Sequence, residues 1–101
     1  MNIDGLIITQ HARERFMARL KNANPEYNGD TDSHLKKLLL MAVPEKKYNL
    51  CKRLMREFKY GSNSRYWVTT DGWRFIEVNN NGQRKIVTIE RICGYQNQVG
   101  D

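Results

Sequence analysis

The stretch "RYWVTTDGWRFIEVNNNGQRKIVTIERI", residues 65–92, decides the fold of this chain. Aromatic and β-branched residues, which favour strands, dominate three runs within it: Arg65 to Thr70, Trp73 to Val78 and Arg84 to Ile92. Asp71-Gly72 separates the first two runs, and Asn79 to Gly82 separates the last two. An Asp-Gly pair between two such runs indicates a hairpin with a two-residue turn. The sequence therefore predicts a three-stranded antiparallel meander.

The two turns decide which side chains share a face of this sheet. With Asp71 and Gly72 at the first tip and a four-residue loop at the second, Trp67 lies opposite Ile76, and Arg74 lies opposite Val87. We expect the more aliphatic face to be the core, with Trp67, Ile76, Val78, Val87 and Ile89. The other face would expose Tyr66, Trp73 and Phe75. A sheet covered on both faces and a reversed assignment are the alternatives.

The N-terminal region has the periodicity of a helix that follows a short strand. From Gln10 onward, apolar residues recur every four positions: Ala12, Phe16, Leu20 and Ala23. Thr9 precedes this pattern and offers a hydroxyl that can cap the helix. The apolar residues Leu6 to Ile8 come just before it and can add an edge strand to the meander.

Two more helices are expected before the meander. Residues 22–33 are rich in Asn, Asp, Gly and Pro, which predicts a surface loop. The second helix follows, with Asp32 or Ser33 as its cap and Pro44 limiting its end. Its apolar positions are Leu35, Leu38, Leu39 and Ala42. Residues 46–60 fit a third, strongly basic helix that Gly61-Ser62-Asn63 ends.

These elements predict an α+β fold in which two to three N-terminal helices pack on the C-terminal meander. A chain of 101 residues forms one domain, 1–101, and we expect its ordered core to span about residues 5–93, with a loose tail from Gly94. The N-terminus lacks the basic start and apolar centre of a signal peptide, so we expect a cytoplasmic protein without membrane contact. Cys51 and Cys93 are isolated, so no disulfide, metal or cofactor is predicted.

The excess of positive charge favours a polyanionic partner. Seventeen Lys and Arg residues against eleven Asp and Glu give a net charge of +6, and the isoelectric point is about 9.6. RNA or another nucleic acid and an acidic protein surface are both compatible with this balance. The expected nucleic-acid contacts lie on the basic third helix and the aromatic sheet face: Lys52, Arg53, Arg56, Tyr66, Trp73, Phe75 and Arg84.

His11 is the main candidate for catalysis. The sequence contains no P-loop, nucleophile elbow or paired carboxylates at a useful spacing. In the first turn of a helix, the dipole favours a neutral imidazole, which can act as a general base near pH 7. Arg15 follows four residues later on the same side of the helix, and Arg74 and Arg91 are candidates to hold a phosphate. The alternative is an ordinary histidine on a solvated basic helix.

The order of strand, helices and antiparallel meander resembles that of small bacterial RelE-like ribonuclease toxins. The local pattern is more similar to a group of small bacterial domains of unknown function whose first helix reads H-A-x-x-R. Here this motif is His11-Ala12-Arg13-Glu14-Arg15, and Ile86 to Arg91 is similar to the last strand of those domains. The resemblance implies helices on one face of the sheet and RNA on the other. RelE-like toxins use Lys, Arg and Tyr residues on the sheet, but these do not map position by position onto this chain.

Two functions from different classes follow as expectations. The first is a metal-independent endoribonuclease of RelE-like type, with His11 as base and Arg15, Arg74 and Arg91 at the phosphate. The second is a non-catalytic basic protein, encoded by a phage or mobile element, that binds nucleic acid or an acidic protein such as an antitoxin. In a third interpretation, the positive charge only keeps the protein soluble. The sequence does not indicate the oligomeric state.

Overall fold

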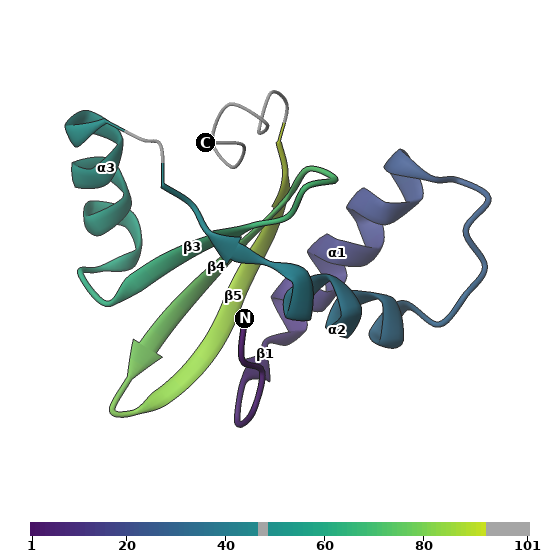
Figure 1. Cartoon of the computed structure of the whole chain (residues 1–101), viewed down its shortest axis with the longest axis horizontal. Helices are drawn as coiled ribbons and strands as arrows, with labels where there is room; N and C mark the ends of the chain where they lie inside the picture. Colours follow the sequence, from purple (N-terminus) through teal and green to yellow (C-terminus); the bar gives the residue numbers. More distant parts are fainter. Residues whose placement is uncertain (47–48, 93–101) are drawn as a thin grey trace.

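The computed structural model describes residues 1–46 and 49–92, and this part of the chain is α+β with three helices and one mixed five-stranded sheet (Figure 1). The elements in chain order are β1 (Ile7–Ile8), α1 (Gln10–Ala23), α2 (Thr31–Met41), β2 (Val43–Pro44), α3 (Leu50–Tyr60), β3 (Ser64–Val68), β4 (Trp73–Asn80) and β5 (Gln83–Arg91). The strand order is β1-β5-β4-β3-β2. The predicted meander is β3-β4-β5, and the strand β2 was not predicted. Cys93 and the tail from Gly94 lie outside the described residues.

The predicted N-terminal edge strand is confirmed, and it pairs parallel to β5. Thr9 joins it to α1: its backbone N–H donates to the carbonyl of Ile86 at 3.1 Å, and its hydroxyl accepts from Ala12 N at 3.1 Å. The predicted cap of α1 is therefore confirmed. Helix α1 runs along β5 in the same direction, since its start binds Ile86 and its end lies beside Glu90 and Arg91 (Figure 1).

The second helix begins two or three residues earlier than the sequence pattern predicted, with Asp32 or Ser33 as the expected cap. Asp30 is the N-cap, and its carboxylate accepts hydrogen bonds from Asp32 N and from the Ser33 hydroxyl. These bonds, that of Ser33 above all, lower the pKa of Asp30. Asp32 and Ser33 lie inside the helix. Neither is its cap, because a cap residue precedes the backbone N–H groups from which its side chain accepts hydrogen bonds.

The third helix is shorter than predicted. Asn49 caps it by accepting from Lys52 N at 2.9 Å, so that α3 begins at Leu50. Gly61 ends it, as predicted, with a φ of 87° that suits glycine. Lys46 lies before the helix, and residues 47–48 are outside the described part of the chain.

Both turns of the meander differ from the prediction. Thr69 N donates to the carbonyl of Trp73, so the first turn holds the three residues 70–72 and not two. At the second turn Asn80 pairs with Gln83, and Asn81 and Gly82 both have positive φ (54° and 81°). This is a two-residue turn, in place of the predicted four-residue loop. A bulge between Ile76 and Glu77 leaves Val87 without a directly opposite residue.

These changes of register place several strand side chains on the face opposite to the predicted one. Trp67 pairs with Phe75, which pairs with Ile89, and this face lies under α1 and α2. Trp73 and Phe75 are 2% and 0% exposed, so the predicted exposure of these two rings is wrong. The core contains Ala12, Phe16, Leu20, Leu35, Leu38, Leu39, Ala42, Trp73, Phe75, Ile86 and Ile89. Val68 and Ile76 are fully buried on the opposite face, so the sheet is covered on both faces.

Candidate functional site

The four residues predicted to be catalytic do not form one site. His11 and Arg15 are exposed near the start of α1. Arg91 lies at the far end of β5, where its guanidinium stacks 4.8 Å from the centre of the Trp73 ring and donates to the carbonyl of Asp71 at 2.7 Å. Asn22, in the last turn of α1, lines a shallow hollow with Arg91. Because Asn22 is eleven residues beyond His11, about 16 Å of helix separates the two ends.

Arg74 lies on the other side of the sheet from α1. It alternates with Trp73 and Phe75, which face the helices, and its neighbour Val68 is on the same side as Tyr66. Its guanidinium donates to Glu45 at 2.7 Å and to Glu90 at 3.3 Å. The sheet therefore lies between His11 and Arg74. With this register, His11 cannot act as the base on a phosphate that Arg74 holds.

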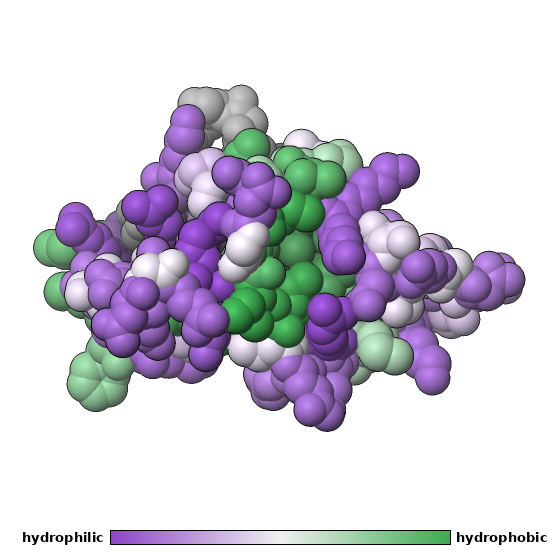
Figure 2. All heavy atoms as spheres, turned by 90° about the horizontal axis from the view of Figure 1, so that it is seen from below, coloured by the Kyte–Doolittle hydropathy of each residue, from purple (hydrophilic) through white to green (hydrophobic). Residues whose placement is uncertain are grey.

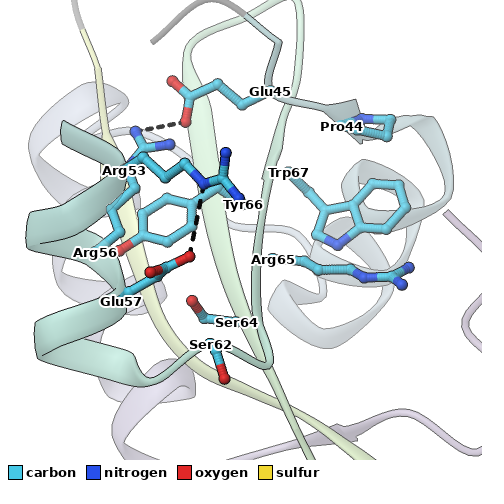
Figure 3. A pocket seen from close by; sticks show the side chains of 10 residues that line it. All are labelled: Pro44, Glu45, Arg53, Arg56, Glu57, Ser62, Ser64, Arg65, Tyr66 and Trp67. Atoms are coloured by element: carbon cyan, nitrogen blue, oxygen red, sulfur yellow. Dashed lines mark ion pairs between the residues drawn. The ribbon is translucent and has the colours of Figure 1, made fainter. Parts of the chain in front are cut away.

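A cleft between α3 and β3 is lined by more charged and hydroxyl-bearing side chains than either predicted site brings together (Figure 3). Its volume is about 560 Å³. The lining residues come from β2 and the residue after it, from α3, and from β3 with the loop before it: Pro44, Glu45, Arg53, Arg56, Glu57, Ser62, Ser64, Arg65, Tyr66 and Trp67. Three of the predicted nucleic-acid contacts, Arg53, Arg56 and Tyr66, meet here.

The Glu45 carboxylate anchors this cleft. It is fully buried, and its two oxygens lie 2.7 Å from Arg56 Nη2 and 2.7 Å from Arg74 Nη2. Burial disfavours the charged form of Arg74, but its hydrogen bonds to Glu45 and Glu90 and their charges outweigh this, so that its pKa is raised. A buried carboxylate shared by two arginines fixes both guanidinium groups in place.

Tyr66 forms the floor of the cleft, beneath α3. The Arg56 guanidinium stacks 3.8 Å from the centre of its ring, and Tyr60 meets it edge-on at 6.2 Å. Burial raises the pKa of Tyr66 to about 12, although the charge of Arg56 acts in the opposite direction. Its hydroxyl is therefore protonated at neutral pH and is available as a hydrogen-bond donor.

The rim of the cleft carries more accessible cations. The Arg53 side chain is 65% exposed and contacts Glu57 at 3.6 Å, which is a loose ion pair one helical turn apart. Arg65 is also exposed and has no carboxylate within ion-pair distance among residues 1–46 and 49–92. Arg53 can therefore reach an anion bound beside α3, while Arg56 and Arg74 are already neutralised. Arg65 points with Trp67 to the other side of β3 (Figure 3).

The other predicted nucleic-acid contacts lie elsewhere. Lys52 is exposed on α3 but does not line the cleft. Arg84 donates to Glu77 at 3.0 Å, and Trp67 Nε1 donates to the same carboxylate at 2.9 Å. Trp73 and Phe75 are core residues, since the three-residue turn places them under the helices. They cannot act as an exposed platform for bases.

Sequence reasoning missed Glu45, Glu57 and Arg65. Glu45 follows Pro44, and the residue before a proline favours an extended backbone, so a strand at Val43-Pro44 had a local signal. Its partners Arg56 and Arg74 lie 11 and 29 residues away, and no sequence spacing indicates such a contact.

Within the described ranges, no group of three or more His, Cys, Asp or Glu side chains is placed to hold a metal ion. No helix there is long and apolar enough to span a bilayer. Comparisons with models of protein families, with curated protein sequences and with solved structures find no significant match for this chain.

Proposed function

We propose that this domain is a binding protein for nucleic acid and that the cleft between α3 and β3 holds the sugar-phosphate backbone. The observation that supports it best is the pair Arg53 and Arg56 at one cleft, of which Arg53 is exposed at the rim (Figure 3). Arginine donates bidentate hydrogen bonds to phosphate, and such contacts supply most of the non-specific affinity for nucleic acid.

The charge of the cleft agrees with this proposal. Its lining contains three arginines and two glutamates, so its formal net charge is 3 − 2 = +1, and the whole chain carries +6. Glu45 neutralises the inner part of the cleft, and Arg53 at the rim is held only by a loose, exposed pair with Glu57.

A second candidate function is metal-independent RNA cleavage in the same cleft. Glu57 and Tyr66 both line it, and the Glu57 side chain is 41% exposed. Glu57 would accept the proton of the RNA 2′-hydroxyl as the 2′-oxygen attacks the phosphorus, and Tyr66 would donate a proton to the departing 5′-oxygen. Arg53 would stabilise the phosphorane charge. This arrangement replaces the His11 set and keeps the analogy with RelE-like toxins.

The binding proposal is tested by titrating the protein against fluorescent single-stranded RNA and DNA over a range of salt concentrations. The variant Arg53→Ala should bind more weakly, and its slope of log affinity against log salt should fall by about 0.7 for one lost phosphate contact. The control Lys36→Ala removes the same charge from an exposed position on α2. Equal weakening by both variants, or no binding by the unmodified protein, would refute the cleft as the site.

The cleavage candidate has its own test. RNA is incubated with the protein in EDTA and analysed on a denaturing gel. Glu57→Gln should abolish cleavage while the RNA affinity changes by less than about twofold, whereas His11→Ala should leave the cleavage rate unchanged. If RNA stays intact but binds, only the cleavage candidate is lost.

A further inference from the structure

Helix α3 carries its apolar stripe on the side that faces away from the rest of the molecule. Leu50, Leu54 and Phe58 are spaced by four residues and lie along one line of the helix, with Met55 beside them. Their exposed fractions are 68%, 56% and 96%, and that of Met55 is 66%. No residue of α3 is buried. Figure 2, which keeps the horizontal axis of Figure 1, shows apolar side chains projecting at the α3 end of the molecule.

The opposite side of α3 makes the contacts to the sheet, and these contacts are polar and aromatic. Arg56 reaches Glu45 and stacks on Tyr66, and Tyr60 meets the same ring. Arg56 is two residues from both Leu54 and Phe58, which is about 200° around a helix. An amphipathic helix usually buries its apolar stripe against its own core. In α3 the polarity is reversed, so none of the elements described in residues 1–46 and 49–92 buries the stripe.

The charges on either side of this stripe indicate which kind of partner would bind it. Lys52 and Lys59 stand three residues before and four residues after Met55, so they flank the stripe on that side. On the other side Arg53 is paired with Glu57. The helix holds four basic residues and one acidic residue, a net charge of 4 − 1 = +3. Because Glu45 neutralises Arg56, a second copy of α3 would bring two charges of 3 − 1 = +2 together, which disfavours self-association.

We infer that the outward stripe of α3 is a docking surface for an acidic amphipathic helix of another protein. The partner helix would place apolar residues on Leu50, Leu54 and Phe58, and carboxylates opposite Lys52 and Lys59. These two lysines are seven residues apart, so the matching carboxylates stand two helical turns apart. This surface is separate from the cleft, because Arg56 and Tyr66 lie on the other side of α3.

The test uses two synthetic amphipathic peptides of about 14 residues, roughly four helical turns. Both carry the same leucine stripe, and one is flanked by glutamates and the other by lysines. Fluorescence anisotropy against the full chain should show at least about tenfold tighter binding of the glutamate peptide. Lys52→Glu/Lys59→Glu should reverse this preference, and Leu54→Ser/Phe58→Ser should abolish binding of both peptides. The matched control Met17→Ser, at an exposed methionine of α1, should bind as the unmodified chain does.

Three results would overturn the proposal. One is equal binding of the two peptides, or binding of neither. Another is a dimer in sedimentation velocity that Leu54→Ser/Phe58→Ser dissolves, which would make a second copy the occupant. The third is partition onto phosphatidylserine vesicles that the same variant removes, which would make the stripe a membrane contact. Circular dichroism melting of each variant confirms folding, and Leu54 and Phe58 are exposed enough for a serine to be tolerated.

Discussion

Arg74 donates a 2.7 Å hydrogen bond from Nη2 to the carboxylate of Glu45, a residue 29 positions earlier in the chain. This bond joins the centre of the meander to the segment that follows β2. Arg56 binds the other oxygen of the same carboxylate, so that α3 is held to the sheet through Glu45. One buried side chain thereby fixes both walls of the cleft.

Glu45→Gln should destabilise the fold by about 3–5 kcal/mol, because it removes the charge that compensates two largely buried arginines. Urea unfolding followed by circular dichroism measures this change. The control Glu57→Gln removes only an exposed pair with Arg53 and should cost less than about 0.5 kcal/mol. Equal effects of the two variants would show that Glu45 does not anchor the cleft.

Alkaline pH should weaken the fold through Tyr66. Its pKa is about 12 in the folded protein, and an unfolded tyrosine titrates near 10.0, so folding disfavours its ionised form. The contribution is fully present below about pH 10 and is lost as the pH rises through the folded pKa near 12. Urea midpoints between pH 9 and pH 12 should fall less steeply for Tyr66→Phe than for the unmodified chain. Parallel curves for the two proteins would contradict the assignment to Tyr66.

The aromatic core should tolerate truncation far less than the outward stripe of α3. Phe16 is 1% exposed and its ring centre lies 4.9 Å from that of Trp73. Phe16→Ala should therefore cost about 3–5 kcal/mol of unfolding free energy. Phe58→Ala removes the same atoms at a position that is 96% exposed, and should change stability by less than about 0.5 kcal/mol. A large loss for Phe58→Ala would mean that the stripe packs within the fold.

Two glycines of the meander should respond differently to alanine. Gly72 and Gly82 both have positive φ (94° and 81°), so alanine is strained at each by roughly 1 kcal/mol. A Cβ at Gly72 would also lie 3.1 Å from the carbonyl oxygen of Ile92, whereas one at Gly82 meets open space. Thermal melting should show the larger loss for Gly72→Ala. The reverse order would contradict the three-residue turn at residues 70–72.

Local signals predicted the elements of the fold well. Thr9 and the spacing of Ala12, Phe16 and Leu20 specify α1 and its cap, because both depend on residues within one or two turns. The meander was predicted from its β-branched and aromatic runs. The edge strand β1 was also expected, while β2 was missed because two residues carry too little periodicity.

The candidate site was predicted only in part. Arg53, Arg56 and Tyr66 were named as nucleic-acid contacts and they do meet in one cleft. His11, Arg15, Arg74 and Arg91 were expected to converge, but α1 separates the first two from Arg91 along its length, and the sheet separates them from Arg74. The position of Arg74 follows from the register, since a turn length that differs by one residue moves a side chain to the other face. The distance between His11 and Arg91 follows instead from the direction in which α1 packs along β5.

The sequence by itself determined the helices, the meander, the cap at Thr9 and the basic charge, because each follows from neighbouring residues or from composition. The tertiary structure alone decided that Trp73 and Phe75 are buried, that Glu45 meets Arg56 and Arg74, and that the apolar stripe of α3 faces outward. Each of these depends on how distant segments pack. Thr69 and the Asn81-Gly82 pair set the register through hydrogen bonds and backbone angles that the hydrophobic pattern does not encode.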